Sequence, residues 1–569
     1  MDSDLPLTDR RFFLGHFAGL GLGGTLFPGV LWAHIKAGAE VTDASIIAAA
    51  EIAGMTFTDD ERKQMLTGIK NQPALIAQLR AVPLENAISP AMVFNPLPAN
   101  AVLPTGPSKA PVRARVTAPA VPGNLEDLAY QPVTVLSELI KSRKITSTAL
   151  TKMYIARLER LNPTLLNTIT VTRARAFAQA AAADEEISRG KYRGALHGIP
   201  WGAKDLLAVK GYPTTWGTPA YKEQTFDEDA VVVQRLDAAG AVLIAKLTLG
   251  ELAQGDIWFG GMTRNPWKPT TGSSGSSAGP GSATAAGCVG FAIGTETLGS
   301  ISSPSTVNGV TGLRPTFGRV PRTGAMALSW SMDKLGPMCR AVEDCALVFG
   351  AMHGPDGRDR SCHDTPFNWN ANIPLTKIRV GYIKSAFDLP MTERQHLSKP
   401  FDDAALAVLK SLGVDLIPVE VPEAPYGAMR LILTAEAGAA FDEFTRSGKV
   451  NQMVQQNPGA WPNTFRSAHL IPAVEYVQAN RVRSVAIAKW AELYKTVDVI
   501  ITPTNAPNQL TATNLTGHPA CILPHGFRDD GTPTSITFLG SLFGEANLLR
   551  VAHAYQQATN FHLKHPTLA

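Results

Sequence analysis

The sequence has few cysteines and little charge for its length. Five cysteines are spread over 569 residues, and none forms a Cys-x-x-Cys pair or another spacing typical of a metal site. Charged residues make up 18% of the chain, and the net charge of +4 comes without a dense basic run. These features argue against a structural metal centre and against nucleic acid as a partner.

Long apolar runs and phosphate-binding motifs are also missing. No stretch of 18 or more uninterrupted apolar residues occurs, so the sequence does not predict a transmembrane helix. The chain lacks a Gly-x-Gly-x-x-Gly motif, and its glycine-rich segment lacks the Gly-Lys-Ser/Thr ending of a phosphate loop. With 45% hydrophobic residues the chain can bury a large core, in one big domain with an appendage or in three or four smaller domains.

The N-terminus resembles a twin-arginine export signal. Arg10 and Arg11 precede a Gly-rich, moderately apolar run, and Ala37-Gly38-Ala39 offers a cleavage site. We therefore predict that residues 1–39 direct export to the periplasm or the medium, without stable membrane insertion after processing. The alternative is an amphipathic N-terminal helix or anchor that stays attached, and the protein would then be cytoplasmic.

Residues 40–124 are predicted to form a helical extension that ends in a proline-rich arm. A capping box at Thr58–Glu61 predicts a helix start, and Pro73 is expected to begin a second helix that ends near Val82. Prolines then accumulate from Asn95 to Gly123, which is typical of an extended arm.

From residue 125 to the end, strand-like and helical segments alternate. Residues 168–171 and 241–245 read as strands, and residues 173–188 and 231–239 read as helices; residues 378–383, 416–421 and 497–502 are further strands. This alternation predicts an α/β fold with a central mixed β-sheet that helices cover on both faces.

A Gly/Ser-rich stretch at residues 272–316 stands out because it carries a buried-strand run at its centre. A flexible linker would not contain such a run, so the stretch indicates backbone that turns tightly around a strand and a helix. Glycines allow the close approach, and serines supply hydroxyl groups. A lone turn serine usually caps a helix, so the case for chemistry rests on the motifs taken together.

Three motifs resemble the amidase signature family of serine hydrolases. Gly275-Ser276-Ser277 matches the first landmark, and the turn from Gly294 to Ser300 matches the second, with Ser276 and Ser300 at the spacing of the family. Upstream, the segment from Gly198 to Asp205 (GIPWGAKD) matches the lysine motif and places the lysine at Lys204. The match covers nearly all of residues 125–569.

The resemblance implies a Ser–cis-Ser–Lys triad and no cofactor or metal. Ser300 would be the nucleophile, Ser276 the proton relay and Lys204 the general base, with a cis peptide bond before Ser276. Backbone N–H groups of Thr297, Leu298, Gly299 and Ser300 would form the oxyanion hole. A lysine acts as a base near neutral pH only where burial or positive charge lowers its pKa.

Three positions depart from the family pattern. Glu296 stands where aspartate is usual, Leu298 where glycine is frequent, and Ser302 where arginine is frequent. Leu298 keeps its N–H group, although its side chain is expected to narrow the pocket. The missing arginine weakens any transfer of substrate preference from other members.

The sequence thus predicts an amidase that cleaves small-molecule carboxylic amides through an acyl-enzyme, with anilides, esters and carbamates as related substrates. Two alternatives stay open: a glutaminase A-type subunit of a tRNA-dependent amidotransferase, and an exported binding protein on the same scaffold. A homodimer also stays open.

Overall fold

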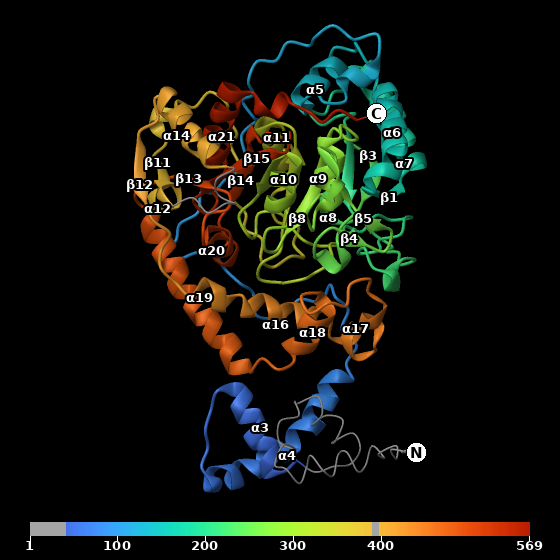
Figure 1. Cartoon of the computed structure of the whole chain (residues 1–569). Coiled ribbons are helices and arrows are strands. Elements are labelled where there is room, and N and C mark those ends of the chain that lie inside the picture. Colours follow the sequence, from blue (N-terminus) through green and yellow to red (C-terminus); the bar gives the residue numbers. More distant parts are fainter. Residues whose placement is uncertain (1–40, 390–397, 569) are drawn as a thin grey trace, which may run out of the picture.

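The computed structural model describes residues 41–389 and 398–568. The predicted export signal, residues 1–39, lies outside the described residues. The chain forms an α/β body around one 11-stranded sheet, and two helices of the extension, α3 (Asp43–Ala53) and α4 (Asp59–Arg80), lie beyond one side of this body (Figure 1). The predicted fold class is confirmed.

The large sheet is mixed, as predicted. Its strands, in spatial order, are β1 (Thr168–Val171), β3 (Val242–Leu247), β2 (Pro200–Lys204), β8 (Phe291–Glu296), β10 (Lys334–Cys339), β9 (Thr311–Arg314), β14 (Ala520–Phe527), β15 (Pro533–Gly540), β13 (Val499–Pro503), β11 (Val380–Ile383) and β12 (Leu416–Val419). β2 runs parallel to β3 and β8, and β11 runs parallel to β12 and β13. The strands from β8 to β13 in this order pair antiparallel.

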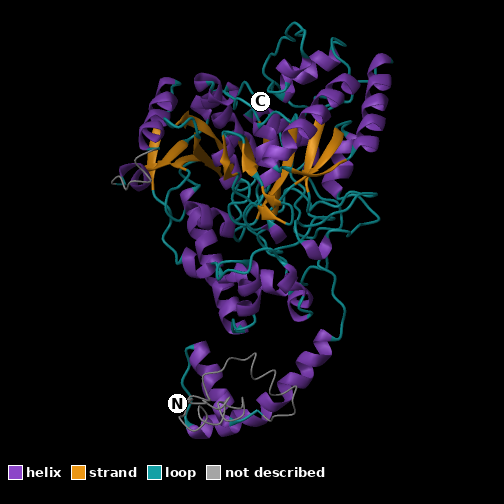
Figure 2. Ribbon diagram, turned by 45° about the vertical axis from the view of Figure 1, so that its right-hand side comes forward, coloured by secondary structure: helices purple, strands orange, loops and turns teal. Residues whose placement is uncertain are grey.

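Helices pack against both faces of the sheet, as Figure 2 shows. Those that surround the sheet are α5 (Val133–Lys141), α6 (Ser147–Leu165), α7 (Arg173–Ser188), α8 (Val231–Ala238), α9 (Ala278–Ala285), α10 (Ser302–Asn308), α11 (Val342–Met352), α14 (Lys399–Ser411), α20 (Gln509–Thr516) and α21 (Glu545–Thr559). A further group, α16 (Leu431–Ala440), α17 (Asp442–Arg446), α18 (Trp461–Ala468) and α19 (Ala473–Leu493), lies between the sheet and the extension (Figure 1).

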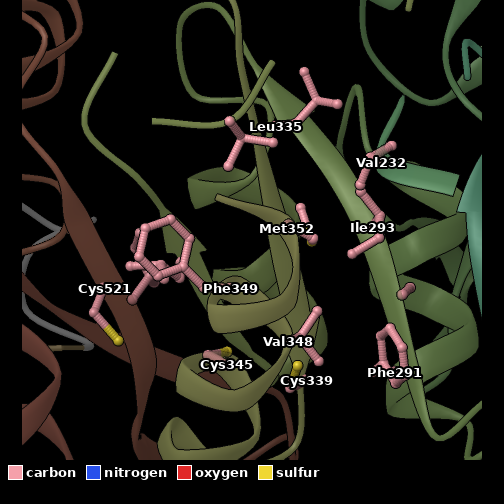
Figure 3. Close-up of a cluster of buried hydrophobic side chains, with 14 of the residues drawn as sticks. Val232, Phe291, Ile293, Leu335, Cys339, Cys345, Val348, Phe349, Met352 and Cys521 are labelled. Carbon is pink, nitrogen blue, oxygen red and sulfur yellow. The ribbon is translucent and has the colours of Figure 1, made fainter. Parts of the chain in front are cut away.

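Alternation along β10 shows why both faces are covered. Leu335 and Cys339 join the large cluster that includes Val348 of α11 (Figure 3), whereas Met338 packs with Ala285 of α9 in a second cluster. Successive side chains of a strand point to opposite faces, so a strand such as β10 that is buried at every position needs a packing partner on each side. The core therefore continues through the sheet.

The extension differs from the prediction at Pro73. The Thr58–Glu61 capping box begins α4 as expected, but α4 continues through Pro73 to Arg80 and no second helix begins there. A proline inside a helix removes one backbone donor and strains the preceding turn without ending every helix. The arm that follows lies on the body, where Val112 pairs with the backbone of Trp369 and Ala371.

Within residues 41–389 and 398–568, no helix combines the length and apolar character needed to cross a membrane. All five cysteines are free thiols, and four of them are buried. Cys339, Cys345 and Cys521 belong to the large core cluster (Figure 3), where they pack as small apolar side chains.

Candidate active site

Lys204 ends β2 and is fully buried. Its Nζ lies 2.8 Å from Ser276 Oγ, 2.8 Å from Thr295 Oγ1 and 3.1 Å from Ser277 Oγ. Burial lowers the pKa of Lys204 well below the ordinary lysine value, although the carboxylates of Asp333 and Glu296 oppose the shift. A neutral amine can donate two hydrogen bonds and accept one, so these three hydroxyls can serve Nζ in its basic form.

The backbone before Ser276 brings its hydroxyl to the lysine. The Gly275–Ser276 peptide bond is cis, as the resemblance implied, and Ser274 lies in the left-handed region with φ 57°. Gly275 faces Gly255, and a Cβ on Gly275 would lie 1.8 Å from the Gly255 carbonyl oxygen, so only glycine fits there. The helix α9 begins directly after Ser277 and holds this turn against the sheet.

Two further hydroxyls orient the lysine, and sequence reasoning gave neither a role. Ser277 Oγ accepts a hydrogen bond from the Thr295 amide and donates to the Thr295 carbonyl oxygen, both at 3.1 Å. Both residues also contact Lys204 Nζ, so they fix it from two sides. The signal was present, because Ser277 and Thr295 belong to the same two motifs that supplied the two serines of the predicted triad.

Ser300 lies in the turn that follows β8. Its carbonyl oxygen accepts a hydrogen bond from the Ser277 amide at 3.1 Å, which joins the two motifs directly. Within the part of the chain that the structure describes, Ser300 Oγ has no protein hydrogen-bond partner, and the amide groups of Leu298 and Gly299 donate to none either. The turn therefore offers a free hydroxyl beside free N–H donors.

Gly299 and Thr297 shape this turn. Gly299 has φ 92°, a conformation that favours glycine. Thr297 Oγ1 donates to Asp333 at 2.6 Å, which anchors the start of the turn. The side chain of Leu298 is half-buried against the large core cluster, so its contribution to the turn is its backbone N–H group.

Glu296 and Ser302, two departures from the family pattern, contact each other. Glu296 Oε2 accepts from the Ile301 amide at 2.9 Å, from the Ser302 amide at 2.8 Å and from Ser302 Oγ at 2.8 Å. Its other oxygen accepts from Arg314 and Asn514, each at 2.8 Å. Burial alone would raise the pKa of Glu296, but Arg314 and these donors lower it to about 2. The charged carboxylate thus holds the backbone that follows Ser300.

Neighbouring titratable groups are engaged elsewhere. Asp205 pairs with Lys246 at 2.6 Å, with both side chains fully buried, and it also accepts from Thr215. His197 is buried, and its Nδ1 accepts a hydrogen bond from the Arg193 amide. Within the described ranges, no three His, Cys, Asp or Glu side chains are grouped as ligands for a metal ion.

A cavity of about 1420 Å³ opens beside the triad motifs. Thr295 and Thr297 line it on the sheet side, and a cluster of aromatic residues lines another side: Trp216, Tyr221, Phe226, Phe441 and Phe444. Residues of the extension also line the cavity. A cavity of this size can hold a substrate of drug-like size or larger.

Comparisons with known proteins identify the family of this chain. The family model described as Amidase matches residues 149–549. The A subunit of the glutamyl-tRNA(Gln) amidotransferase from Marinomonas sp. is 31% identical over 488 residues, which cover 77% of this chain and 99% of that protein. "Putative amidase AmiD" from Mycobacterium tuberculosis is 35% identical over 487 residues, which cover 79% and 98%.

The structure is also similar to that of the native peptide amidase from Stenotrophomonas maltophilia. The TM-score is 0.67 at 29% identity, and the match covers 76% of this chain and 98% of that one. Since the family model spans well over half of the chain and these relatives match over nearly their full length, the chain belongs to the amidase family, the amidase signature enzymes, and is a hydrolase that acts on carbon–nitrogen bonds.

Proposed function

We propose that this enzyme hydrolyses neutral carboxylic amides through an acyl-enzyme on Ser300. Ser300 Oγ attacks the carbonyl carbon, its proton passes to Ser276, and the Ser276 proton passes to neutral Lys204. The N–H groups of Thr297, Leu298 and Gly299 would stabilise the oxyanion. Collapse of the tetrahedral intermediate breaks the C–N bond, and Lys204 returns the proton through Ser276 to the leaving amine. Water then hydrolyses the acyl-enzyme ester on Ser300.

The contact between Lys204 and Ser276 carries this proposal. A lysine in water is protonated at neutral pH and cannot accept a proton. Here the lysine is fully buried, its pKa is lowered, and its Nζ lies 2.8 Å from the relay hydroxyl. Ser300 Oγ has no hydrogen-bond partner among the described residues, and catalytic hydrogen bonds commonly tighten only when substrate is bound. Anilides, esters and carbamates present a similar carbonyl and leaving group.

The charges around the cavity favour a neutral substrate. Arginines that line the cavity each pair with a carboxylate: Arg322 with Asp359, Arg358 with Glu228, and Arg446 with Asp442. Arg80 is engaged as well. Nearer the triad, Arg314 is occupied by Glu296, and serine replaces the frequent arginine at position 302. A substrate carboxylate would therefore have to compete with a carboxylate of the protein.

The same observation weighs against the glutaminase alternative. The name of the Marinomonas relative supports that alternative, because it denotes part of a glutamyl-tRNA(Gln) amidotransferase. However, the α-carboxylate of glutamine needs a cation, and export would separate this chain from tRNA. Glutaminase activity that exceeds hydrolysis of neutral amides would favour the alternative over our proposal.

The first experiment is labelling with a fluorophosphonate, followed by peptide mass spectrometry. We expect the adduct on Ser300 and its loss in Lys204→Ala, with the same far-ultraviolet circular dichroism in both proteins. Labelling that persists in Lys204→Ala would show that another base activates the serine. A folded wild-type protein that neither reacts nor hydrolyses any amide would favour the binding-protein alternative.

We also propose that the enzyme acts outside the cytoplasm after twin-arginine export. The support is the Arg10–Arg11 pair and the apolar run that follows it. Fractionation of the producing cells should find a shortened protein in the exported fraction. Replacement of both arginines by lysine should keep the full-length protein in the cytoplasm, and an unchanged distribution would contradict the proposal.

A further inference from the structure

We propose that residues 81–89, here called the strap, form one wall of the substrate cavity and select amides that carry a large apolar or aromatic group. The inference rests on the proposed function, because it concerns the substrate of the same site. It assigns a role to a segment that lies before the family match, which begins at residue 149.

The strap lies between α4 and the proline-rich arm and reaches the cavity along its length. Residues 81–87 and Ser89 all line the cavity that Thr295 and Thr297 line on the other side. Thr295 Oγ1 lies 2.8 Å from Lys204 Nζ. The same cavity therefore borders the strap and Thr295, which contacts Lys204, although Lys204, Ser276 and Ser300 do not line it themselves.

Asn86 fixes the strap to two parts of the body. Its Oδ1 accepts from the Ala327 amide at 2.7 Å, and its Nδ2 donates to the carbonyl oxygens of Ala327 at 2.9 Å and Ala440 at 3.3 Å. Ala327 belongs to a loop that lines the cavity, and Ala440 ends α16. Asn86 is half-buried, whereas the other residues of the strap are exposed. A single side-chain amide thus holds an otherwise exposed segment in place.

The chain is fixed again just beyond the strap. The ring of Phe94 lies over the Arg483 guanidinium, 3.4 Å from ring centroid to Cζ, and packs edge-on against Phe317 at 5.1 Å. A cation over a ring contributes more where water is excluded, and Arg483 is fully buried. The strap is therefore held at Asn86 and again at Phe94, which gives the wall a defined position.

Both the strap and the body contribute apolar side chains to the cavity. The strap contributes Val82, Pro83 and Leu84. The body contributes aromatic rings that pack on one another: Trp216 on Tyr221 at 4.8 Å, Trp216 on Phe441 at 6.2 Å and Tyr221 on Phe444 at 5.4 Å. An apolar or aromatic substituent between these walls would lose contact with water on two sides. That is the physical basis of the selectivity.

The test compares the Ser300 labelling rates of two fluorophosphonates that differ only in a methyl or a dodecyl chain. In Asn86→Ala we expect the dodecyl-to-methyl rate ratio to fall about tenfold, because the loosened strap contacts the long chain less. Asn71→Ala is the matched control, since Asn71 is an exposed asparagine of α4. An unchanged ratio in Asn86→Ala, or an equal fall in both variants, would overturn the selectivity.

A crosslink tests the position of the strap without any catalysis. We expect the double variant Asn86→Cys and Ala327→Cys to form a disulfide on mild oxidation, because the Asn86 side chain contacts the backbone of Ala327. Oxidation should also restore the dodecyl-to-methyl ratio that the reduced double variant has lost. If the protein folds but the crosslink fails to form, the proposed position of the strap is wrong, whether or not Ser300 is labelled.

The two proposals fail in different ways. Absence of labelling on Ser300 in the wild type would remove the proposed reaction and, with it, the selectivity, while the crosslink would still decide where the strap lies. Labelling on Ser300 with a failed crosslink would retain the reaction and reject the strap.

Discussion

The α/β body and the N-terminal extension bury their side chains very differently. Every residue of the strands β2, β8 and β10 is buried, whereas α3 buries only Ile46 and Ala50 and α4 buries none among the side chains that the structure describes. Because burial of apolar surface is the main source of stability, the body stabilises itself. The extension buries little apolar surface and is held to the body at the cavity by a few contacts, such as those of Asn86.

The largest expected effect is a loss of activity on substitution of the proposed triad, which lies in the buried part of the body. Lys204→Met should lower kcat by about 1000-fold or more, as should Ser276→Ala and Ser300→Ala, because the three groups act as one unit in the proposed mechanism. Lys210→Met, an exposed lysine in the same region, is the control and should retain activity. Initial rates with a neutral anilide measure the effect, and substantial turnover in Lys204→Met would contradict the assigned base.

A fully buried ion pair in the body can be compared with a partly exposed pair in the extension. Glu296→Gln should destabilise the protein by about 3–5 kcal/mol. It leaves the charge of Arg314 buried without a carboxylate, and the NH2 group of the glutamine cannot accept the hydrogen bonds that Glu296 accepts, such as that from the Ile301 amide. Asp43→Asn breaks the Arg62–Asp43 pair of the extension and should not change the stability measurably.

Urea unfolding followed by tryptophan fluorescence measures both changes. Equal losses of stability in the two variants would show that the extension and the body are more tightly coupled than their burial suggests.

Two leucines test the same contrast in the apolar core. Leu243→Ala in β3 should cost roughly 2–5 kcal/mol, because the side chain is fully buried and leaves a cavity. Leu75→Ala in α4 should be close to neutral, since Leu75 is 58% exposed and alanine favours helix. Thermal unfolding compares the two, and a large loss for Leu75→Ala would indicate that α4 is buried by another surface.

The last prediction concerns the pH dependence of kcat/KM, which should be set by Lys204 in the body and not by the extension. In the proposed mechanism the base must be neutral, so kcat/KM should rise with pH as Lys204 loses its proton and then level off. Because burial lowers the pKa of Lys204, levelling should occur below the pH at which a free lysine titrates. Asn86→Ala should leave the midpoint of this profile in place. A rate that falls as pH rises would contradict a lysine base.

Much of the fold follows from local pattern. The strand at Thr168–Val171 and the helix at Arg173–Ser188 occur with the predicted bounds, because their residues match the period of each element. Pro73 was misjudged, since the neighbouring residues of α4 keep the helix intact around it. Whether a proline ends a helix depends on the whole segment and not on the proline alone.

The sequence, through its family resemblance, also identified the triad residues and their predicted roles, but not the contacts that surround them. Glu296 and Ser302 were two separate departures in the sequence, and only the fold shows that one accepts hydrogen bonds from the other. Ser277 and Thr295 had no predicted role, because contacts with Lys204 Nζ join residues more than 70 positions apart. Such distances are invisible to local pattern.

By itself, the sequence determined the α/β class, because periodicity is a property of neighbouring residues. Its resemblance to the amidase signature family singled out the three motifs that contain Lys204, Ser276 and Ser300. The tertiary structure decided that Lys204 is buried and that Asn86 ties the strap to Ala327, 241 positions away. Burial removes water from a charge, and packing brings distant backbone together. Neither effect exists until the chain has folded.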